Sequence, residues 1–183
     1  MMPIGPLMIE HRLIERMISV MKEELQRLEK GKEVDTAFIV TAVDFIRTYA
    51  DRCHHGKEED ILFRELQKKN LSEEHKRIMN ELLEEHKWGR KTTGRLVEAN
   101  EDYIDGDKKA LSKISHCLRS LIEFYPKHIV KEDKHFFIPV MAYFPQAEKD
   151  AMLREGHDFD QKLIHEKYEK TVIEAAKRFT SQP

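Results

Sequence analysis

The chain has 183 residues, the length of one ordinary domain with a substantial core. Charged residues make up 36% of it and hydrophobic residues 40%, with only seven Gly and six Pro; this composition is typical of long amphipathic helices and argues against strands. Its 34 acidic and 32 basic residues are mixed along the chain, which argues against nucleic acid as a partner because no basic face stands out.

Apolar residues recur at helical spacing in five segments that are bounded by capping residues, glycine or proline. These segments predict helices at about residues 6–31, 35–70, 72–103, 107–139 and 146–179. Short connections make consecutive helices antiparallel neighbours. We therefore predict an all-α fold with a single domain over residues 1–183. Its core is an up-down-up-down four-helix bundle at about 6–140, with an additional C-terminal helix at about 146–179.

The sequence also gives an expectation for the cellular compartment of the protein. No apolar run approaches the roughly 20 residues that cross a bilayer, and the first residues lack the pattern of a cleavable signal. We expect a cytoplasmic protein without membrane association. In a reducing compartment Cys53 and Cys117 are expected to be thiols that pack as small buried side chains.

Four of the ten histidines fall at one height in the predicted bundle. Measured from the end that carries the first and third turns, they lie about 17 to 21 residues along their helices, which agrees within roughly one helical turn. Apolar residues surround each one at helical offsets, so all four should point into the core. These converging histidines are His11, His54, His86 and His128.

Two of these histidines have a glutamate four residues later on the same helix face, His54 with Glu58 and His128 with Glu132. An unpaired carboxylate in a bundle core costs several kcal/mol, and two close together repel, so a shared cation is the simplest explanation. Imidazole nitrogen and carboxylate oxygen suit iron, manganese or zinc, and helical bundles hold iron pairs with bridging carboxylates. We expect two carboxylate-bridged iron ions per chain, with zinc or manganese as alternatives.

The segments CHHGKEEDILF at 53–63 and YPKHIVKED at 125–133 complete the order H, HxxxE, H, HxxxE along the chain. In these motifs and in this order, residues 7–140 resemble the hemerythrin-like HHE cation-binding domains. The resemblance implies a set of ligands in which the glutamates bridge the two metals. The implied ligands are His11, His54, Glu58, His86, His128 and Glu132.

Two departures separate the chain from the oxygen carriers of that family. They have a second histidine four residues after the third-helix ligand, where this chain has Arg90. They also take their last carboxylate from the fifth residue after the fourth-helix histidine, here Asp133. Five residues turn a helix about 140° past His128 and four only about 40°, so Glu132 is preferred.

Six protein ligands for two metals leave positions for a small diatomic ligand or peroxide. We therefore expect a non-haem diiron protein that binds, senses or reduces dioxygen, peroxide or nitric oxide; the sequence does not decide whether it is an enzyme. The alternative is an iron-binding regulatory, storage or iron-donor module without turnover. A mononuclear or zinc-bound structural site uses the same ligand types. The amphipathic C-terminal helix offers a face for a homodimer.

Several neighbouring residues keep more than one interpretation. His55 and Glu59 form a second HxxxE pair, which a helix turns about 100° away from the first. His135, seven residues after His128, is either a residue near the metals or a core or rim side chain. Glu15 is expected to face inward as a hydrogen-bond partner or a packing residue. Tyr49 and Tyr125 either bring phenols near the metals or only pack.

Overall fold

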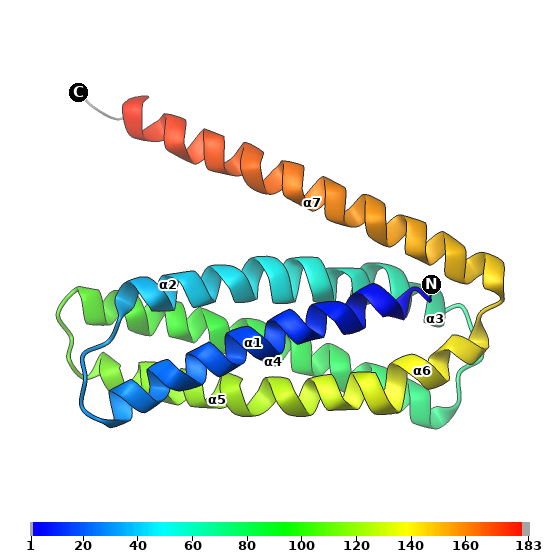
Figure 1. Ribbon diagram of the computed structural model, residues 1–183, viewed down its shortest axis with the longest axis horizontal. Helices are drawn as coiled ribbons and strands as arrows, with labels where there is room; N and C mark the ends of the chain where they lie inside the picture. Colours follow the sequence, from blue (N-terminus) through cyan, green and yellow to red (C-terminus); the bar gives the residue numbers. More distant parts are fainter. Residues whose placement is uncertain (1, 181–183) are drawn as a thin grey trace.

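Every regular element of the protein is a helix in the part of the chain that the structure describes (Figure 1). The computed structural model describes the backbone of residues 2–180 and the side chains of residues 2–163 and 167. Each of the five predicted segments corresponds to one helical run. Much of the C-terminal helix expected to mediate a homodimer has its side chains outside this described part.

The first and third runs are regular α-helices whose ends follow from their sequences. Helix α1 spans Ile4–Glu29, and the chain leaves it through Gly31, whose φ of 75° suits a residue without a Cβ atom. Helix α4 spans Glu73–Ile104. The Ser72 hydroxyl caps its start by accepting a hydrogen bond of 3.2 Å from the backbone N–H of His75.

The second and fourth runs change their winding where the motif residues lie. The second comprises α2 (Thr36–Phe45), η1 (Ile46–His55), η2 (Glu58–Phe63) and α3 (Arg64–Leu66). The fourth comprises α5 (Ala110–Val130), η3 (Lys131–Phe136), α6 (Phe137–Val140) and η4 (Met141–Tyr143). The segments η1, η2 and η3 are π-helical, a wide winding that is rare in proteins and is found often at functional sites.

The four runs form the predicted bundle, and its apolar core has two parts. One cluster fills the end nearer the α1–α2 and α4–α5 turns, and includes Ile14, Ala50 and Leu96. The other fills the opposite end, and includes Leu7, Ile61 and Leu82. In the first three runs, a motif histidine lies in the sequence between a residue of one cluster and a residue of the other. The two clusters therefore enclose the polar motif residues in a buried layer between them.

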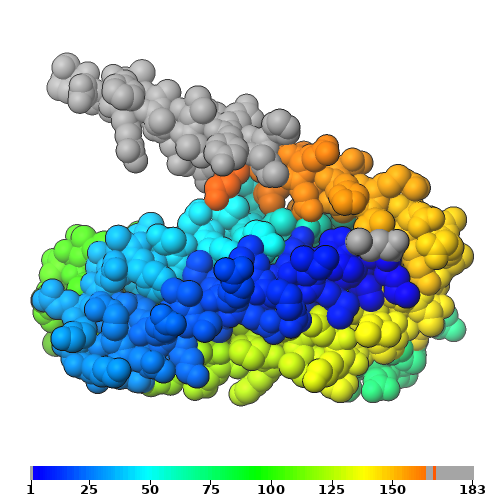
Figure 2. Space-filling model, in the orientation of Figure 1, coloured from blue at the N-terminus to red at the C-terminus, as the bar shows by residue number. Residues whose placement is uncertain are grey.

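Helix α7 (Gln146–Thr180) lies outside the four-helix bundle, and its first part lies on η1 and η2 (Figures 1 and 2). Met152 and Leu163 are buried there. Gly56 allows a close approach, because a Cβ atom at that position would lie 2.8 Å from the Phe159 ring. In the described residues we find no helix that is long and apolar enough to span a membrane.

Candidate metal centre

All six ligands implied by the sequence are buried, and they come from the four runs of the bundle. Glu58, Glu132, His11 and His86 have no exposed surface, and His54 and His128 are at most 2% exposed. The structure therefore buries these six side chains at one height of the bundle, and their role as metal ligands stays a prediction. The structure divides them into two groups of donor atoms that share the two glutamates.

The first group consists of His11, His54, Glu58 and Glu132, whose donor atoms all lie within 4.8 Å of one another. His11 Nε2 lies 3.1 Å from Glu132 Oε2, and His54 Nε2 lies 3.3 Å from Glu58 Oε1. The rings of His11 and His54 meet edge to face, with centroids 4.5 Å apart. This group provides two imidazoles and one oxygen of each glutamate.

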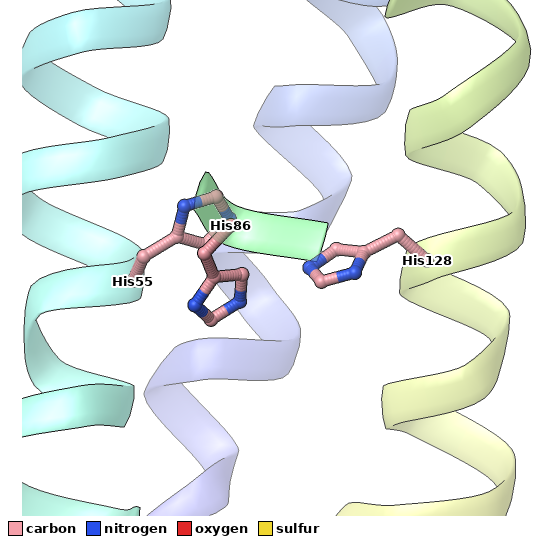
Figure 3. A group of neighbouring side chains, drawn as sticks. All are labelled: His55, His86 and His128. Atoms are coloured by element: carbon pink, nitrogen blue, oxygen red, sulfur yellow. The ribbon is translucent and has the colours of Figure 1, made fainter. Parts of the chain in front are cut away.

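The second group contains a histidine that was not among the implied ligands. His55, His86 and His128 each place a ring nitrogen within 4.8 Å of the others, and they project toward one another from η1, α4 and α5 (Figure 3). His55 is 2% exposed and stacks on His86, with ring centroids 3.9 Å apart and ring planes at 12°. This group therefore provides three imidazoles.

Each glutamate has one oxygen beside each group. Glu58 Oε2 lies 3.3 Å from His86 Nε2, while its Oε1 faces His54. Glu132 Oε1 lies 3.1 Å from His128 Nε2, while its Oε2 faces His11. A carboxylate placed in this way can bridge two cations, one on each side.

Most of these inner atoms lack hydrogen-bond partners although they are buried. The contacts between the histidine nitrogens and the glutamate oxygens are short, but they do not have hydrogen-bond geometry. Two ligands bound at right angles to one metal ion at about 2.1 Å lie about 3.0 Å apart, close to the 3.1 and 3.3 Å found here. The donor set therefore fits metal ions. The unpartnered inner atoms are Nε2 of His11, His54, His86 and His128 and both oxygens of Glu58 and Glu132.

Comparison with known families agrees with this geometry. The model of the hemerythrin HHE cation-binding domain matches residues 2–137, about three quarters of the chain. The chain belongs to this family. Searches of curated proteins and of solved structures find no match to it. Membership of the hemerythrin HHE family implies that the domain binds metal cations.

In this hemerythrin HHE domain, a carboxylate supports each of the five inner histidines from behind. A carboxylate accepts hydrogen bonds, so Nδ1 carries a hydrogen, and Nε2, once it has lost its own proton, points a free electron pair inward. Metal-ligating histidines usually have a partner of this kind. The pairs are His11 with Asp133 (2.8 Å), His54 with Glu10 (2.9 Å), His55 with Asp51 (3.4 Å), His86 with Glu59 (2.7 Å) and His128 with Glu85 (2.7 Å).

Four of these pairs run around the bundle in one direction. Glu10 of the first run bonds to the histidine of the second, and Glu59 of the second bonds to the histidine of the third. Glu85 of the third run bonds to the histidine of the fourth, and Asp133 of the fourth bonds to the histidine of the first. Each of these acids directly precedes or follows an inner residue in the sequence. That adjacency is the signal that could have identified them, since a neighbouring residue lies on the flank of the helix and reaches the next helix.

Every supporting carboxylate also contacts a basic side chain. Arg90 binds two of the carboxylates, and three other cations bind one each. The contacts are Asp133 with Arg12, Glu10 with Lys57, Glu85 with Lys131 (2.5 Å), and both Asp51 (2.6 Å) and Glu59 (2.6 Å) with Arg90. In the sequence, Arg90 stands out only because it occupies the place of a histidine in the family's oxygen carriers, and the other three cations were not predicted.

Charges in the centre shift the pKa values of the inner histidines. Burial by itself would lower the pKa of His11, but Asp133 and Glu132 raise it to about 10. Burial would also lower the pKa of His86, but its contacts with Glu132 and Glu58 raise it to about 11. In the absence of a cation, protonated histidines therefore compensate the buried carboxylates.

The pKa values of His128 and His55, the other two histidines of the second group, shift in opposite directions. Burial would lower the pKa of His128, but the charge of Glu132 raises it to about 9. The pKa of His55 lies well below its ordinary value because of burial and the charge of His86, which Asp51 only partly offsets. His55 is therefore the neutral member of the group.

The π-helical winding explains two differences from the sequence analysis. A wider turn rotates each residue by less than the roughly 100° of an α-helix, so His54 and His55 both reach the inside. In η3 the same change moves His135 off the inner face, and His135 is exposed. The second HxxxE pair does not form a unit, because Glu59 lies outside the centre against His86 and Arg90.

The structure also gives the positions of the other residues that the sequence suggested near the centre. Glu132, and not Asp133, lies between the two groups, as preferred from the sequence. The expectation that Glu15 faces inward was wrong, because it pairs with Arg12 at 2.9 Å on the half-exposed side of α1. Tyr49 packs against Phe45. Both cysteines are free and buried, as expected.

A cavity of about 350 Å³ leads to the second group. Its wall includes His55, Arg90 and the buried Tyr125. The remaining lining residues are Ile46, Arg47, Asp51, Gly89 and Thr93. A small molecule can therefore approach the three-histidine side of the centre from the surface.

Proposed function

We propose that this hemerythrin HHE domain holds two iron ions and binds, senses or reduces a small oxidant such as dioxygen, peroxide or nitric oxide. The observation that carries the proposal is the set of buried nitrogen and oxygen atoms that face one another without hydrogen-bond partners. Nitrogen and oxygen donors in a helical bundle, with carboxylates between histidines, suit a pair of iron ions.

The two groups differ in how many donors they offer. His11 and His54 with one oxygen of each glutamate make four donors, and His55, His86 and His128 with the remaining oxygens make five. His55 thus raises the number of protein donors that we expected from the sequence. Iron held in this way would supply one-electron chemistry and would leave positions for a small ligand.

The protein itself contributes three things to this proposed chemistry. Glu58 and Glu132 provide negative charge that offsets the charge of the cations. The outer carboxylates keep each imidazole in the orientation and tautomer that point Nε2 inward. The apolar clusters at both ends exclude water, which strengthens the electrostatic interactions inside.

Elemental analysis of protein purified without chelator tests the proposal. About two irons per chain are expected in the wild type, with loss of metal in His54→Ala and Glu132→Ala because both residues supply inner donor atoms. His135→Ala is the matched control, since this exposed histidine also lies in the motif region and should keep both ions.

The oxidant part has its own test. The loaded protein should change its visible spectrum on addition of dioxygen, peroxide or nitric oxide. Two bound irons that respond to none of these would favour a storage, donor or regulatory module. No metal in the wild type, or metal unaffected by the inner substitutions, would contradict the assignment of the centre.

A further inference from the structure

Arg90 binds the carboxylates behind two inner histidines, whereas Arg12, Lys57 and Lys131 each bind one. Its Nε donates to Asp51 Oδ1 at 2.6 Å, and its Nη2 donates to Glu59 Oε1 at 2.6 Å. Asp51 accepts from Nδ1 of His55, and Glu59 accepts from Nδ1 of His86. One guanidinium therefore connects, through two carboxylates, to both stacked rings.

We propose that Arg90 is a positioning residue that holds His55 and His86 as two ligands of the same metal ion. This inference rests on the proposed function and adds to it a residue that sets the affinity of one of the two ions. Arg90 does not touch the inner donor atoms. It acts only by fixing Asp51 and Glu59, which in turn fix the rings.

The stacked rings require such support. With centroids 3.9 Å apart and planes at 12°, His55 and His86 can aim their inner nitrogens at one point only in a narrow range of ring rotations. The hydrogen bond at Nδ1 sets that rotation. The bond from His55 to Asp51 is the longest of the five, at 3.4 Å, so Asp51 depends most on a second contact to hold its place.

The guanidinium has the right shape for this task. Its N–H groups are fixed in a plane and can donate to two acceptors at once, whereas a lysine ammonium is a single point on a flexible stem. Arg12, Lys57 and Lys131 each bind one supporting carboxylate of the inner histidines. Arg90→Lys therefore keeps the charge and removes the double contact, which separates geometry from charge.

The test is a titration of metal-free protein with Co²⁺, followed by the visible absorption of the bound ion. Wild type should take up two ions. Arg90→Lys should weaken one of the two binding steps by about 10- to 100-fold, the usual effect of losing an outer-shell partner, and leave the other step unchanged. Lys87→Met is the matched control, because Lys87 is an exposed residue of the same helix that pairs with Glu84.

A double-mutant cycle distinguishes positioning from a general effect on folding. If Arg90 acts through His55, the loss in the Arg90→Lys/His55→Ala double variant should be clearly smaller than the sum of the two single losses. Asp51→Asn should weaken the same binding step, and it provides a second variant if Arg90→Lys folds poorly. Circular dichroism of the metal-free proteins verifies that each variant is folded.

Three results would overturn the inference. Two ions bound by Arg90→Lys with unchanged constants would show that the double contact is not needed. Additive effects of Arg90→Lys and His55→Ala would show that Arg90 does not act through His55. A wild type that binds no Co²⁺ and no iron would remove the proposed function itself, and this inference with it.

Discussion

Glu58 and Glu132 are the residues whose positions are hardest to explain without a cation. Both have no exposed surface, and burial by itself would raise the pKa of each carboxyl. The pKa of Glu132 nevertheless lies well below its ordinary value, because His128, His11 and His86 surround it. In the metal-free protein, protons on the histidines take the place of the positive charge that metal ions would supply.

Metal uptake should therefore release protons. The pKa values of His11, His86 and His128 are raised to about 10, 11 and 9, so all three rings carry a proton at about pH 7 that a metal ion must displace. We expect at least about three protons per chain on saturation with Co²⁺ at this pH, since the pKa of His54 is also raised. A pH indicator in weakly buffered solution measures the release.

The neutral histidine of the centre gives the control for this release. Because the pKa of His55 is lowered, His55→Ala at saturating metal should release nearly as many protons as the wild type. Metal binding without any proton release would mean that the inner histidines are neutral in the metal-free protein, contrary to the charge balance described here.

At the scale of elements, the outer helix α7 is connected to the centre through one buried lysine. Lys57 is 5% exposed and bonds to Glu10, which supports His54. It also bonds at 2.6 Å to Asp160 of α7, which additionally accepts from the Cys53 thiol at 3.3 Å. The other contacts of this part of α7 include an exposed pair, Arg64 with Glu155.

Loss of the Asp160 charge should loosen α7 more than loss of an exposed charge on the same helix. Asp160→Asn weakens a charge-assisted hydrogen bond to a buried lysine, which contributes about 1.5 kcal/mol or more. Amide hydrogen exchange over residues 150–163 should become roughly tenfold faster. Glu155→Gln is the control and should change exchange little, since exposed ion pairs contribute about 0 to 1 kcal/mol. Equal effects of the two substitutions would contradict a special role for the buried contact.

At the scale of the whole molecule, the centre joins all four runs of the bundle. Each run supplies at least one inner donor, and each run also supplies a carboxylate that supports a histidine of another run. The inner donors lie between the two apolar clusters, where the bundle has polar side chains in place of packed hydrophobic ones. Bound metal should therefore stabilise the entire bundle, because the unfolded chain cannot bring these donors together.

Removal of metal by a chelator should lower the melting temperature, and the size of the effect should depend on pH. Stability from raised histidine pKa values in the metal-free protein is fully present below about pH 6.5 and is lost as the pH rises through about 9 to 11. Metal affinity changes in the opposite direction, because fewer protons compete for the rings at high pH. Metal should therefore raise the melting temperature more at about pH 8.5 than at about pH 6. Melting temperatures that are independent of metal at both pH values would contradict this coupling.

The sequence alone determined the helical fold and the height of the centre in the bundle. Helical periodicity, caps and short turns are local properties, and in an antiparallel bundle a residue count converts directly into height. This is why the residue count predicts one height for His11, His54, His86 and His128, which the structure buries close together with Glu58 and Glu132. The i and i+4 spacing likewise put each glutamate beside its histidine, because four residues turn a helix only slightly more than once.

The tertiary structure decided which other residues join the centre. The π-helical segments bring His55 inward and leave His135 exposed, and a fixed α-helical period does not foresee such a change in winding. Four of the histidines, His11, His54, His86 and His128, pair with a carboxylate from another helix, and which carboxylate each one meets depends on how the helices face one another. The sequence shows Arg90 only where the oxygen carriers have a histidine. Its contacts with both Asp51 and Glu59 appear only in the folded structure.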